Sequence, residues 1–114
     1  MTPAARPGPL RGAKLFAALR LAPARRGALL TVRRRNAPAG ERAGIGMAVS
    51  AKVGGAVVRN KIRRRLRTSW RLLMAERPET ALWQLFIQVQ PAAARADFRT
   101  LDDEFRRLTV PRPA

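Results

Sequence analysis

Residues 56–76, AVVRNKIRRRLRTSWRLLMAE, constrain the fold more than any other segment of this chain. At the ~100° advance per residue of an α-helix, the apolar residues and one serine of this segment fall within a single arc. They are Val58, Ile62, Leu66, Ser69, Trp70 and Leu73. Two glycines precede the segment and Pro78 follows it, so the pattern predicts one long helix that ends before the proline and packs its apolar arc on a sheet.

The remaining surface of this helix is basic. A continuous flank holds Arg59, Asn60, Arg63, Arg64, Arg67 and Arg71, and the other shoulder holds Lys61 and Arg65. Arginines at i,i+4 spacing repel each other, at a cost of roughly a few tenths of a kcal/mol per pair. No acid that could offset this repulsion occurs between Glu41 and Glu76. Bound phosphates would neutralise the arginines and release counterions, so we predict a phosphate-binding face.

Two other interpretations of the basic helix stay open. A charge run is often only a solvated surface, although solvated surfaces usually mix acidic and basic residues. A basic amphipathic helix can also lie on an anionic membrane, but here the core needs the apolar arc. Asn60 can donate and accept hydrogen bonds to a sugar, a base or a backbone group, or it is a cap or simply exposed.

The charge of the whole chain agrees with a polyanionic partner. The 114 residues suit one small domain and carry a formal net charge of +17. Residues 1–75 hold 18 basic residues and one acid, whereas residues 76–114 hold six of each. Of the 24 basic residues 21 are Arg, whose planar fork grips phosphate bidentately, although a genome rich in G and C would also enrich Arg.

Missing residue types exclude several kinds of chemistry. Without Cys or His there are no disulfides, thiolate nucleophiles, Cys/His zinc sites or histidine acid–base catalysis. Asp102, Asp103 and Glu104 point in different directions around a helix, so we expect no two-metal hydrolytic site on the protein. The N-terminal sequence has no signal-peptide core and no apolar run could cross a bilayer, so we expect a cytoplasmic protein.

Hydrophobic periodicity predicts five further elements. Helices are expected over residues 13–21 and 98–108, the second with Asp97 as its N-cap. Strands are expected over residues 28–35, 42–50 and 82–90, and the first two are expected to pair as a hairpin. The predicted class is α+β, an α-β-β-α-β-α sandwich. The long helix makes a crossover if the strands on either side of it are parallel neighbours.

The predicted RNA-binding domain spans residues 13–109. A Pro- and Gly-rich segment, 1–12, is expected to lack fixed structure, and residues 110–114 form a tail. Within the domain, Gly44 and Gly46 share one face of the second strand. A face without side chains leaves room for a ligand or another backbone, or a helix packs there.

The start of the long helix resembles a known family signature. Residues 50–67, SAKVGGAVVRNKIRRRLR, are similar to the signature of the bacterial ribonuclease P protein subunit. That signature is a Ser and a Lys-(Ile/Val)-Gly loop, followed by Ala-Val-x-Arg-Asn-x-x-Lys-Arg-x-x-Arg on a helix. The matching positions are Ser50, Lys52, Val53, Gly54, Ala56, Val57, Arg59, Asn60, Arg64 and Arg67. Arg63 stands where Lys is common, and element order and length agree over most of the chain.

The resemblance implies a fold and a function. The family fold has a left-handed β-α-β crossover, against the usual right-handed rule. In the family a large RNA carries the active site and its Mg²⁺ ions, and the holoenzyme removes the 5′ leader from precursor tRNA. The small protein binds that catalytic RNA, holds the leader in a cleft between the sheet and the first helix, and strengthens metal binding indirectly. A non-catalytic subunit of an RNA-based endoribonuclease is therefore implied, with no membrane and no obligate protein partner.

The resemblance also implies site residues. The contact surface for the catalytic RNA would be formed by Arg59, Asn60, Lys61, Arg63, Arg64, Arg67 and Arg71. The leader cleft would involve Phe16, Thr31, Arg33, Ser50 and Lys52. Helical spacing alone favours a core role for Phe16, whereas the resemblance favours a stacking surface. No catalytic or metal-binding residue is expected on the protein.

Three departures from the family pattern affect the cleft. Arg20 stands where the family often has a second aromatic in the first helix, and Thr31 lies near a position that is often aromatic. The family commonly has Arg-x-Pro where this chain has Val89-Gln90-Pro91. Because stacking on an aromatic ring contributes ~1–3 kcal/mol per base, we expect leader binding here to depend more on charge.

A general RNA-binding protein, such as a small ribosomal protein, is the main alternative. It needs only the basic helix, and it leaves the Lys52-Val53-Gly54 loop and the glycine-rich strand face unexplained. A membrane-surface protein is a third alternative, which competition between anionic vesicles and RNA would test.

Overall fold

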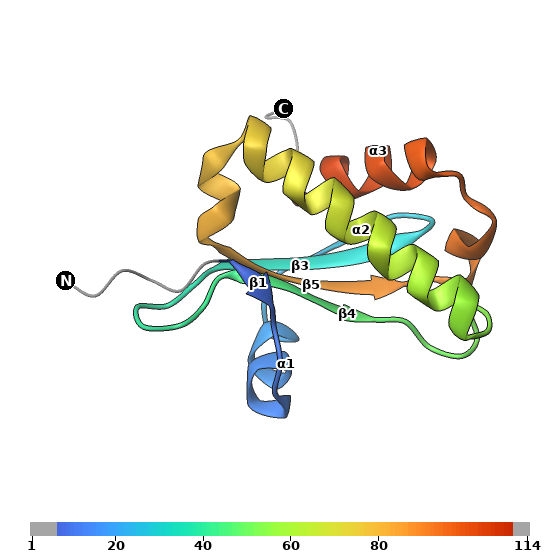
Figure 1. The fold of residues 1–114 in the computed structure, drawn as a ribbon. Helices are drawn as coiled ribbons and strands as arrows, with labels where there is room; N and C mark the ends of the chain where they lie inside the picture. The colour runs from blue at the N-terminus through green and yellow to red at the C-terminus, as the bar shows by residue number, and fades with distance from the viewer. Residues whose placement is uncertain (1–6, 111–114) are drawn as a thin grey trace.

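A computed structural model describes residues 7–110, and Figure 1 shows the arrangement of their elements. Within this part of the chain, one mixed sheet has the strand order β1-β4-β5-β3-β2. The strands are β1 (Gly8–Pro9), β2 (Ala24–Arg26), β3 (Leu30–Asn36), β4 (Gly44–Ala48) and β5 (Trp83–Val89). Helices α2 (Ala56–Glu76) and α3 (Phe98–Thr109) cover one face, and α1 (Ala13–Leu19) lies against the other. Two short 3₁₀ helices, η1 (Pro78–Leu82) and η2 (Pro91–Arg95), flank β5.

Two apolar clusters hold these layers together. The larger cluster lies between the sheet and helices α2 and α3, where Leu66, Ile87 and Phe105 are fully buried. The smaller cluster lies on the α1 side and contains Leu19 and Phe86. Because side chains alternate between the faces of a strand, β5 contributes to both clusters. Leu85 and Ile87 face the larger one, and Phe86, which lies between Gln84 and Gln88, faces the smaller one.

The predicted elements are present, with small shifts at their ends. α2 has the predicted bounds, and the predicted arc is buried except for Val58, which is half-buried. α3 begins after Asp97, whose carboxylate accepts a hydrogen bond from the Thr100 N–H at 2.8 Å, as an N-cap does. The α+β class and the N-cap are therefore confirmed.

The predicted hairpin between residues 28–35 and 42–50 is wrong. β5 lies between β3 and β4, antiparallel to β3 and parallel to β4. A strand that is buried on both faces suits the centre of a sheet, and β5 takes this position although it is the last strand in the sequence. α2 therefore connects two parallel neighbours, β4 and β5, through a left-handed crossover, as the resemblance implies (Figure 1).

The expectation that residues 1–12 lack fixed structure is wrong for residues 7–12. β1 lies in this segment and pairs in parallel with β4. A Cβ at Gly44 would lie 1.8 Å from the Gly8 carbonyl oxygen, and Gly44 has a φ of +150°, so this close contact requires glycine. The close approach of another backbone to Gly44, one of the two alternatives for the glycine face, is thus confirmed.

The folded unit extends beyond residues 13–109 at both ends. Leu10 is buried in the smaller cluster, and Val110, the first residue of the predicted tail, packs half-buried on the larger one. The other residues of the two predicted terminal segments, 1–6 and 111–114, lie outside the described residues. In the part of the chain between them, no helix combines the length and the apolarity needed to cross a bilayer.

Candidate nucleic-acid interface

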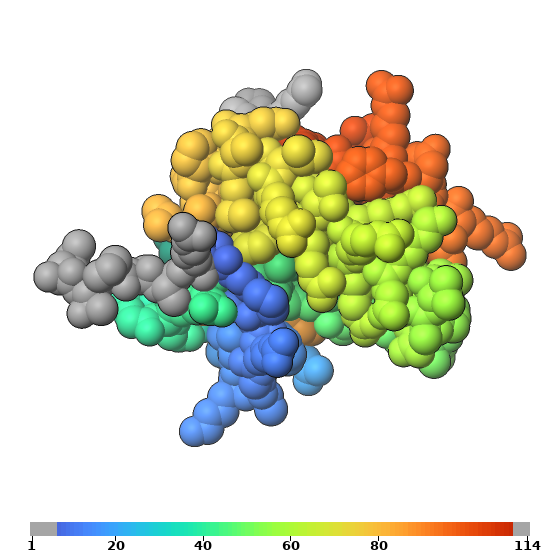
Figure 2. All heavy atoms as spheres, viewed as in Figure 1, coloured from blue at the N-terminus to red at the C-terminus, as the bar shows by residue number. Residues whose placement is uncertain are grey.

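The basic residues of α2 lie on the surface that the core leaves free. Arg64 and Arg71 are exposed on the side of the helix opposite its buried arc. Arg63 and Arg67 are half-buried and line a hollow beside β1 and β4, which Phe16 of α1 also lines. Figure 2 shows α2, in green and yellow, across the visible face of the molecule above α1. The basic surface of α2 thus adjoins the α1 side of the sheet.

Lys61 lies apart from these arginines. Together with Arg65 it lines a second hollow, formed with residues 93–97 of η2 and the segment after it. The Arg65 guanidinium donates a hydrogen bond to the Ala96 carbonyl at 3.1 Å. The RNA-binding set that the resemblance implies therefore divides between two sides of the helix, with Lys61 on one and Arg63 on the other.

The charge of α2 is uncompensated within residues 7–110. Ion pairs in this part of the chain involve β3, the end of α2 and α3, and none involves a basic residue between 59 and 71. The neutral Asn60 accepts a hydrogen bond from Arg63 at 3.3 Å through its Oδ1. Repelling cations without local acids attract a polyanion, because its phosphates remove the repulsion.

The implied leader-cleft residues differ in how much surface they offer. Phe16 of α1 is half-buried and contacts Phe86 of β5, with ring centroids 5.3 Å apart and an interplanar angle of 61°. Ser50 and Lys52 are exposed in the turn between β4 and α2. Thr31, in contrast, is only 6% exposed, so its side chain offers little surface to a ligand.

Arg33 has a role within the fold. Its Nη1 donates hydrogen bonds to the carbonyls of Arg20 and Ala22, at 2.8 and 2.9 Å, where α1 ends. The carbonyls at a helix C-terminus lack intrahelical donors and attract a cation. Arg33 therefore fastens the end of α1 to β3, and its Nε is buried without a partner among the described residues.

The next two arginines of β3 also act within the fold. Arg34 lies 4.1 Å from the centroid of the Trp83 ring and donates a hydrogen bond to the Thr109 carbonyl at 2.8 Å. Burial in this setting lowers the pKa of Arg34 from its ordinary value. Arg35 pairs with Glu41 at 3.2 Å. Part of the net positive charge thus serves the fold, which composition alone does not reveal.

Gly46 lets α1 approach the sheet. A Cβ at this position would lie 2.6 Å from Cε1 of Phe16, so the absent side chain makes room for the ring. Helix packing, the other alternative considered for the glycine face, is therefore confirmed at Gly46. The two glycines serve different neighbours, a helix here and the backbone of β1 at Gly44.

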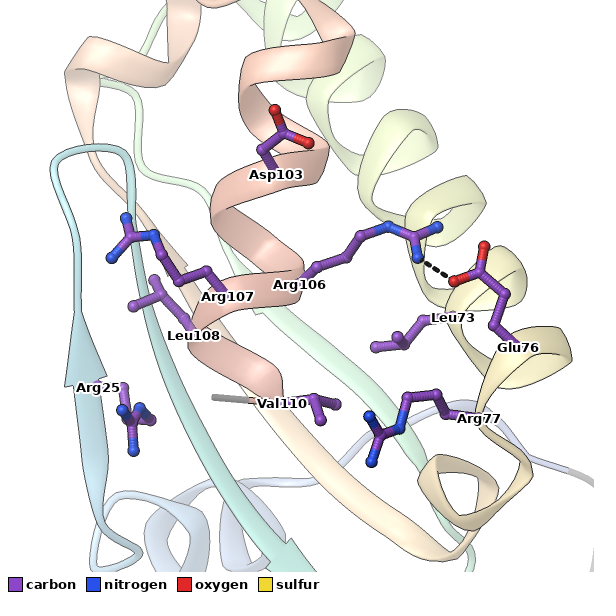
Figure 3. A pocket seen from close by; sticks show the side chains of 9 residues that line it. All are labelled: Arg25, Leu73, Glu76, Arg77, Asp103, Arg106, Arg107, Leu108 and Val110. Atoms are coloured by element: carbon purple, nitrogen blue, oxygen red, sulfur yellow. Dashed lines mark hydrogen bonds and ion pairs between the residues drawn. The ribbon is translucent and has the colours of Figure 1, made fainter. Parts of the chain in front are cut away.

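A second group of arginines lies at the other end of α2, where acids compensate their charge. A cavity there has a volume of about 720 Å³. Figure 3 shows the side chains that line it, those of Arg25, Leu73, Glu76, Arg77, Asp103, Arg106, Arg107, Leu108 and Val110. Arg106 donates hydrogen bonds to Glu76 at 2.5 Å and to Asp102 at 2.9 Å. The bond to Glu76 raises the pKa of Arg106 above its ordinary value, with Asp102 adding to the effect. This mixed charge makes the cavity a poorer phosphate site than the exposed side of α2.

The described residues do not fit a Mg²⁺ ion. Within residues 7–110, no three acidic side chains lie together as metal ligands. Asp97 caps α3, Asp102 holds Arg106, and Glu104 accepts backbone hydrogen bonds from β3 and the residues before it. Because Mg²⁺ is held by free carboxylates together with substrate phosphates, no step through this ion is assigned to the protein.

The fold and this surface define a class, a small α+β protein with an uncompensated basic crossover helix beside a partly aromatic face. A family model described as Ribonuclease P matches residues 9–110. The chain belongs to the ribonuclease P protein family.

Relatives with the same description share part of their length with this chain. The ribonuclease P protein component of Acidothermus cellulolyticus is 48% identical over 63 residues, which are 55% of this chain and 51% of that protein. The component of Thermus aquaticus is 38% identical over 92 residues, which are 81% of this chain and 52% of that protein. The chain thus spans about half the length of the curated relatives it matches.

Solved structures show the same fold at low sequence identity. The RNase P protein from Thermotoga maritima has a TM-score of 0.76 and 20% identity, and the match covers 94% of this chain and 99% of that one. The Staphylococcus aureus RNase P protein has a TM-score of 0.75 and 17% identity, covering 88% and 90%. These likenesses support the architecture described above.

Proposed function

We propose that this chain is the protein subunit of a bacterial ribonuclease P. It binds the catalytic RNA through α2 and the 5′ leader of precursor tRNA through the α1 side of the sheet. The observation that carries the proposal is the uncompensated charge of α2. Two of its arginines, Arg63 and Arg67, line the same hollow as Phe16. The catalytic RNA and its Mg²⁺ ions supply the hydrolysis that gives the mature 5′ end. The protein contributes binding and positioning.

The implied site residues divide into two contact surfaces. The catalytic RNA contacts the basic side of α2, where Asn60, Arg64 and Arg71 are exposed and Arg59, Arg63 and Arg67 are half-buried. Lys61 adds a contact only where the RNA reaches the side of η2. The leader contacts Phe16, Ser50 and Lys52, which offer surface. Arg33 acts on the leader indirectly, by fixing α1.

The first experiment is sequencing of the RNA that co-purifies with a tagged chain. We expect a single large RNA, and ribosomal subunits in its place would favour a general RNA-binding protein. The purified chain alone should not cleave precursor tRNA, and with its RNA it should lower the Mg²⁺ concentration that cleavage requires. Fractionation should find the complex in the bacterial cytoplasm.

Leader binding has its own test. Precursor tRNA should bind the holoenzyme more tightly than mature tRNA, because only the precursor carries the 5′ leader. Equal affinity for the two RNAs would contradict the leader role while leaving the contact with the catalytic RNA intact.

A further inference from the structure

The edge of β4 is open beside the basic surface of α2. β1 pairs with β4 only at Gly44 and Ile45, and the Leu10 N–H, which donates to the Ile45 carbonyl at 2.9 Å, makes the last backbone bond between the segments. Backbone groups of successive strand residues point to opposite edges, so Met47 faces the same edge as Ile45. Its N–H and C=O therefore point outward, with no backbone partner from the described residues.

This edge opens into a hollow of about 170 Å³. Its apolar wall includes Leu10, Phe16 and Met47, and its basic wall holds Arg11, Arg63 and Arg67. No acid lines the hollow, and none of its three arginines forms an ion pair with the described residues. It thus combines uncompensated charge, an aromatic ring and two free backbone groups in one place.

We propose that this hollow binds one nucleotide of single-stranded RNA. Arg63 and Arg67 hold its phosphate, because a guanidinium grips phosphate oxygens bidentately. The base lies against Phe16 and directs its Watson–Crick edge, where a donor and an acceptor are adjacent, to the backbone of Met47. The β4-edge site (Phe16, Met47, Arg11, Arg63 and Arg67) rests on the proposed function and deepens it. It places a nucleotide where the surface for the catalytic RNA meets the leader cleft.

Charge and length favour a nucleotide over a peptide strand. An added strand pairs with a run of outward backbone groups. Between the end of β1 and the end of β4, only Met47 directs its groups outward. Three arginines without an acid suit a phosphate, whereas an ordinary peptide would leave their charge uncompensated.

The test is an NMR titration of the ¹⁵N-labelled full chain with uridine 5′-monophosphate, adenosine 5′-monophosphate or inorganic phosphate. Both nucleotides should shift the backbone amide of Met47 and the Nε–H of Arg67. Inorganic phosphate should shift Arg67 and leave Met47 in place. The same Met47 shift with inorganic phosphate, or no shift with either nucleotide, would overturn the base-binding site.

Arg67→Gln tests the phosphate contact. Because a charged hydrogen bond is lost, nucleotide affinity should fall roughly tenfold or more. Arg64→Gln is the matched control, since it removes the same charge from the same helix but lies outside the hollow. It should leave nucleotide affinity nearly unchanged and still weaken binding of the large RNA. An equal loss in both variants would show unspecific attraction and overturn the site.

Met47→Pro tests the backbone contact. Proline removes the outward N–H without breaking the ladder to β5 and is tolerated at a sheet edge. Nucleotides should then bind this variant no better than inorganic phosphate does. Met47→Leu keeps the N–H and should bind nucleotides normally. If Met47→Pro fails to fold, the Met47 amide shift and Arg67→Gln still decide the question.

Two further arms separate this site from the proposed function. A gel shift with the cognate RNA tests the proposed function. If the RNA binds normally and nucleotides leave the NMR signal of the Met47 amide unchanged, only the β4-edge site is overturned. Failure of the RNA to bind overturns the proposed function, whatever the nucleotides do. An acidic peptide that moves Met47 when nucleotides do not would show that the edge binds protein, and would also overturn the proposal.

Discussion

The Glu104 carboxylate of α3 fills the space where a side chain on Gly27 would lie, because a Cβ there would be 2.5 Å from the carboxyl carbon. The N–H groups of Ala28, Leu29 and Leu30 donate hydrogen bonds to this carboxylate at 3.0, 2.8 and 2.7 Å. A buried anion with three backbone donors therefore joins α3 to the start of β3, in addition to the apolar contacts between them.

Glu104→Gln should destabilise the protein by about 2–3 kcal/mol, because the amide group lacks one acceptor oxygen and leaves a buried N–H unpaired. Urea unfolding measures the change. Asp103→Asn is the control, since Asp103 is the exposed neighbour on the same helix, and it should stay within about 0.5 kcal/mol. If Glu104→Gln lowered the free energy of unfolding as little as the control does, the carboxylate would not hold α3 to the start of β3.

The cap of α3 should make stability depend on pH. The hydrogen bond from the Thr100 N–H holds the pKa of Asp97 below its ordinary 3.8. Because the pKa of Asp97 is lower in the folded state, the charged cap stabilises the fold at pH values above the unfolded-state pKa. This stabilisation is lost as the pH falls through the folded-state pKa. Asp97→Ala should thus lower the melting temperature at pH ~6, and the difference from the parent should shrink below pH ~4. A constant difference from neutral to acidic pH would exclude the charged cap.

Arg64→Ala and Arg67→Ala should each weaken binding of the catalytic RNA. Each lost phosphate contact should reduce the slope of log affinity against log salt concentration by about one unit. Binding titrations at several salt concentrations measure the slope. Arg99→Ala, at an exposed position on α3, is the control for a change of net charge. A slope unchanged from the parent would place the arginine off the interface.

Arg33→Ala should release the end of α1, because the Arg20 and Ala22 carbonyls, just after the helix, lose their donor. Amide exchange in α1 should become faster, and the preference for precursor over mature tRNA should fall. The salt dependence of binding to the catalytic RNA should stay unchanged. Arg20→Ala is a matched control, since Arg20 contributes only its backbone carbonyl to the contact. Equal effects in the two variants would indicate that the loss of a positive charge, and not the release of α1, changes the preference for precursor tRNA.

The bounds and buried arc of α2 could be predicted because the apolar spacing and Pro78 act within the helix or next to it. The pairing of β3 could not. The expectation that neighbouring strands pair as a hairpin takes no account of a later strand that is buried on both faces, and β5 displaces the local partner. β1 and β2 have two and three residues, too few for any periodicity to appear.

Charged residues were harder to place. Arg33, Arg34 and Arg35 have the composition of an RNA-binding strand, yet carbonyls, a ring and an acid of the same chain engage them. Glu104 did carry a signal, because it interrupts the apolar stripe that includes Leu101 and Phe105. A carboxylate on a buried stripe needs donors. Those donors lie far back in the sequence, where spacing gives no indication of them.

The central place of β5 determines when the binding surfaces can appear during synthesis. β5 joins the pair β1–β4 to the pair β2–β3, and before it emerges the two pairs are separate and have open edges. Contacts between distant segments form slowly, so the sheet is a late event and a fragment that stops before Trp83 should aggregate. The residues of the basic helix are complete at Glu76. A nascent chain therefore carries its RNA-attracting helix before it has the sheet against which α1 forms the second surface.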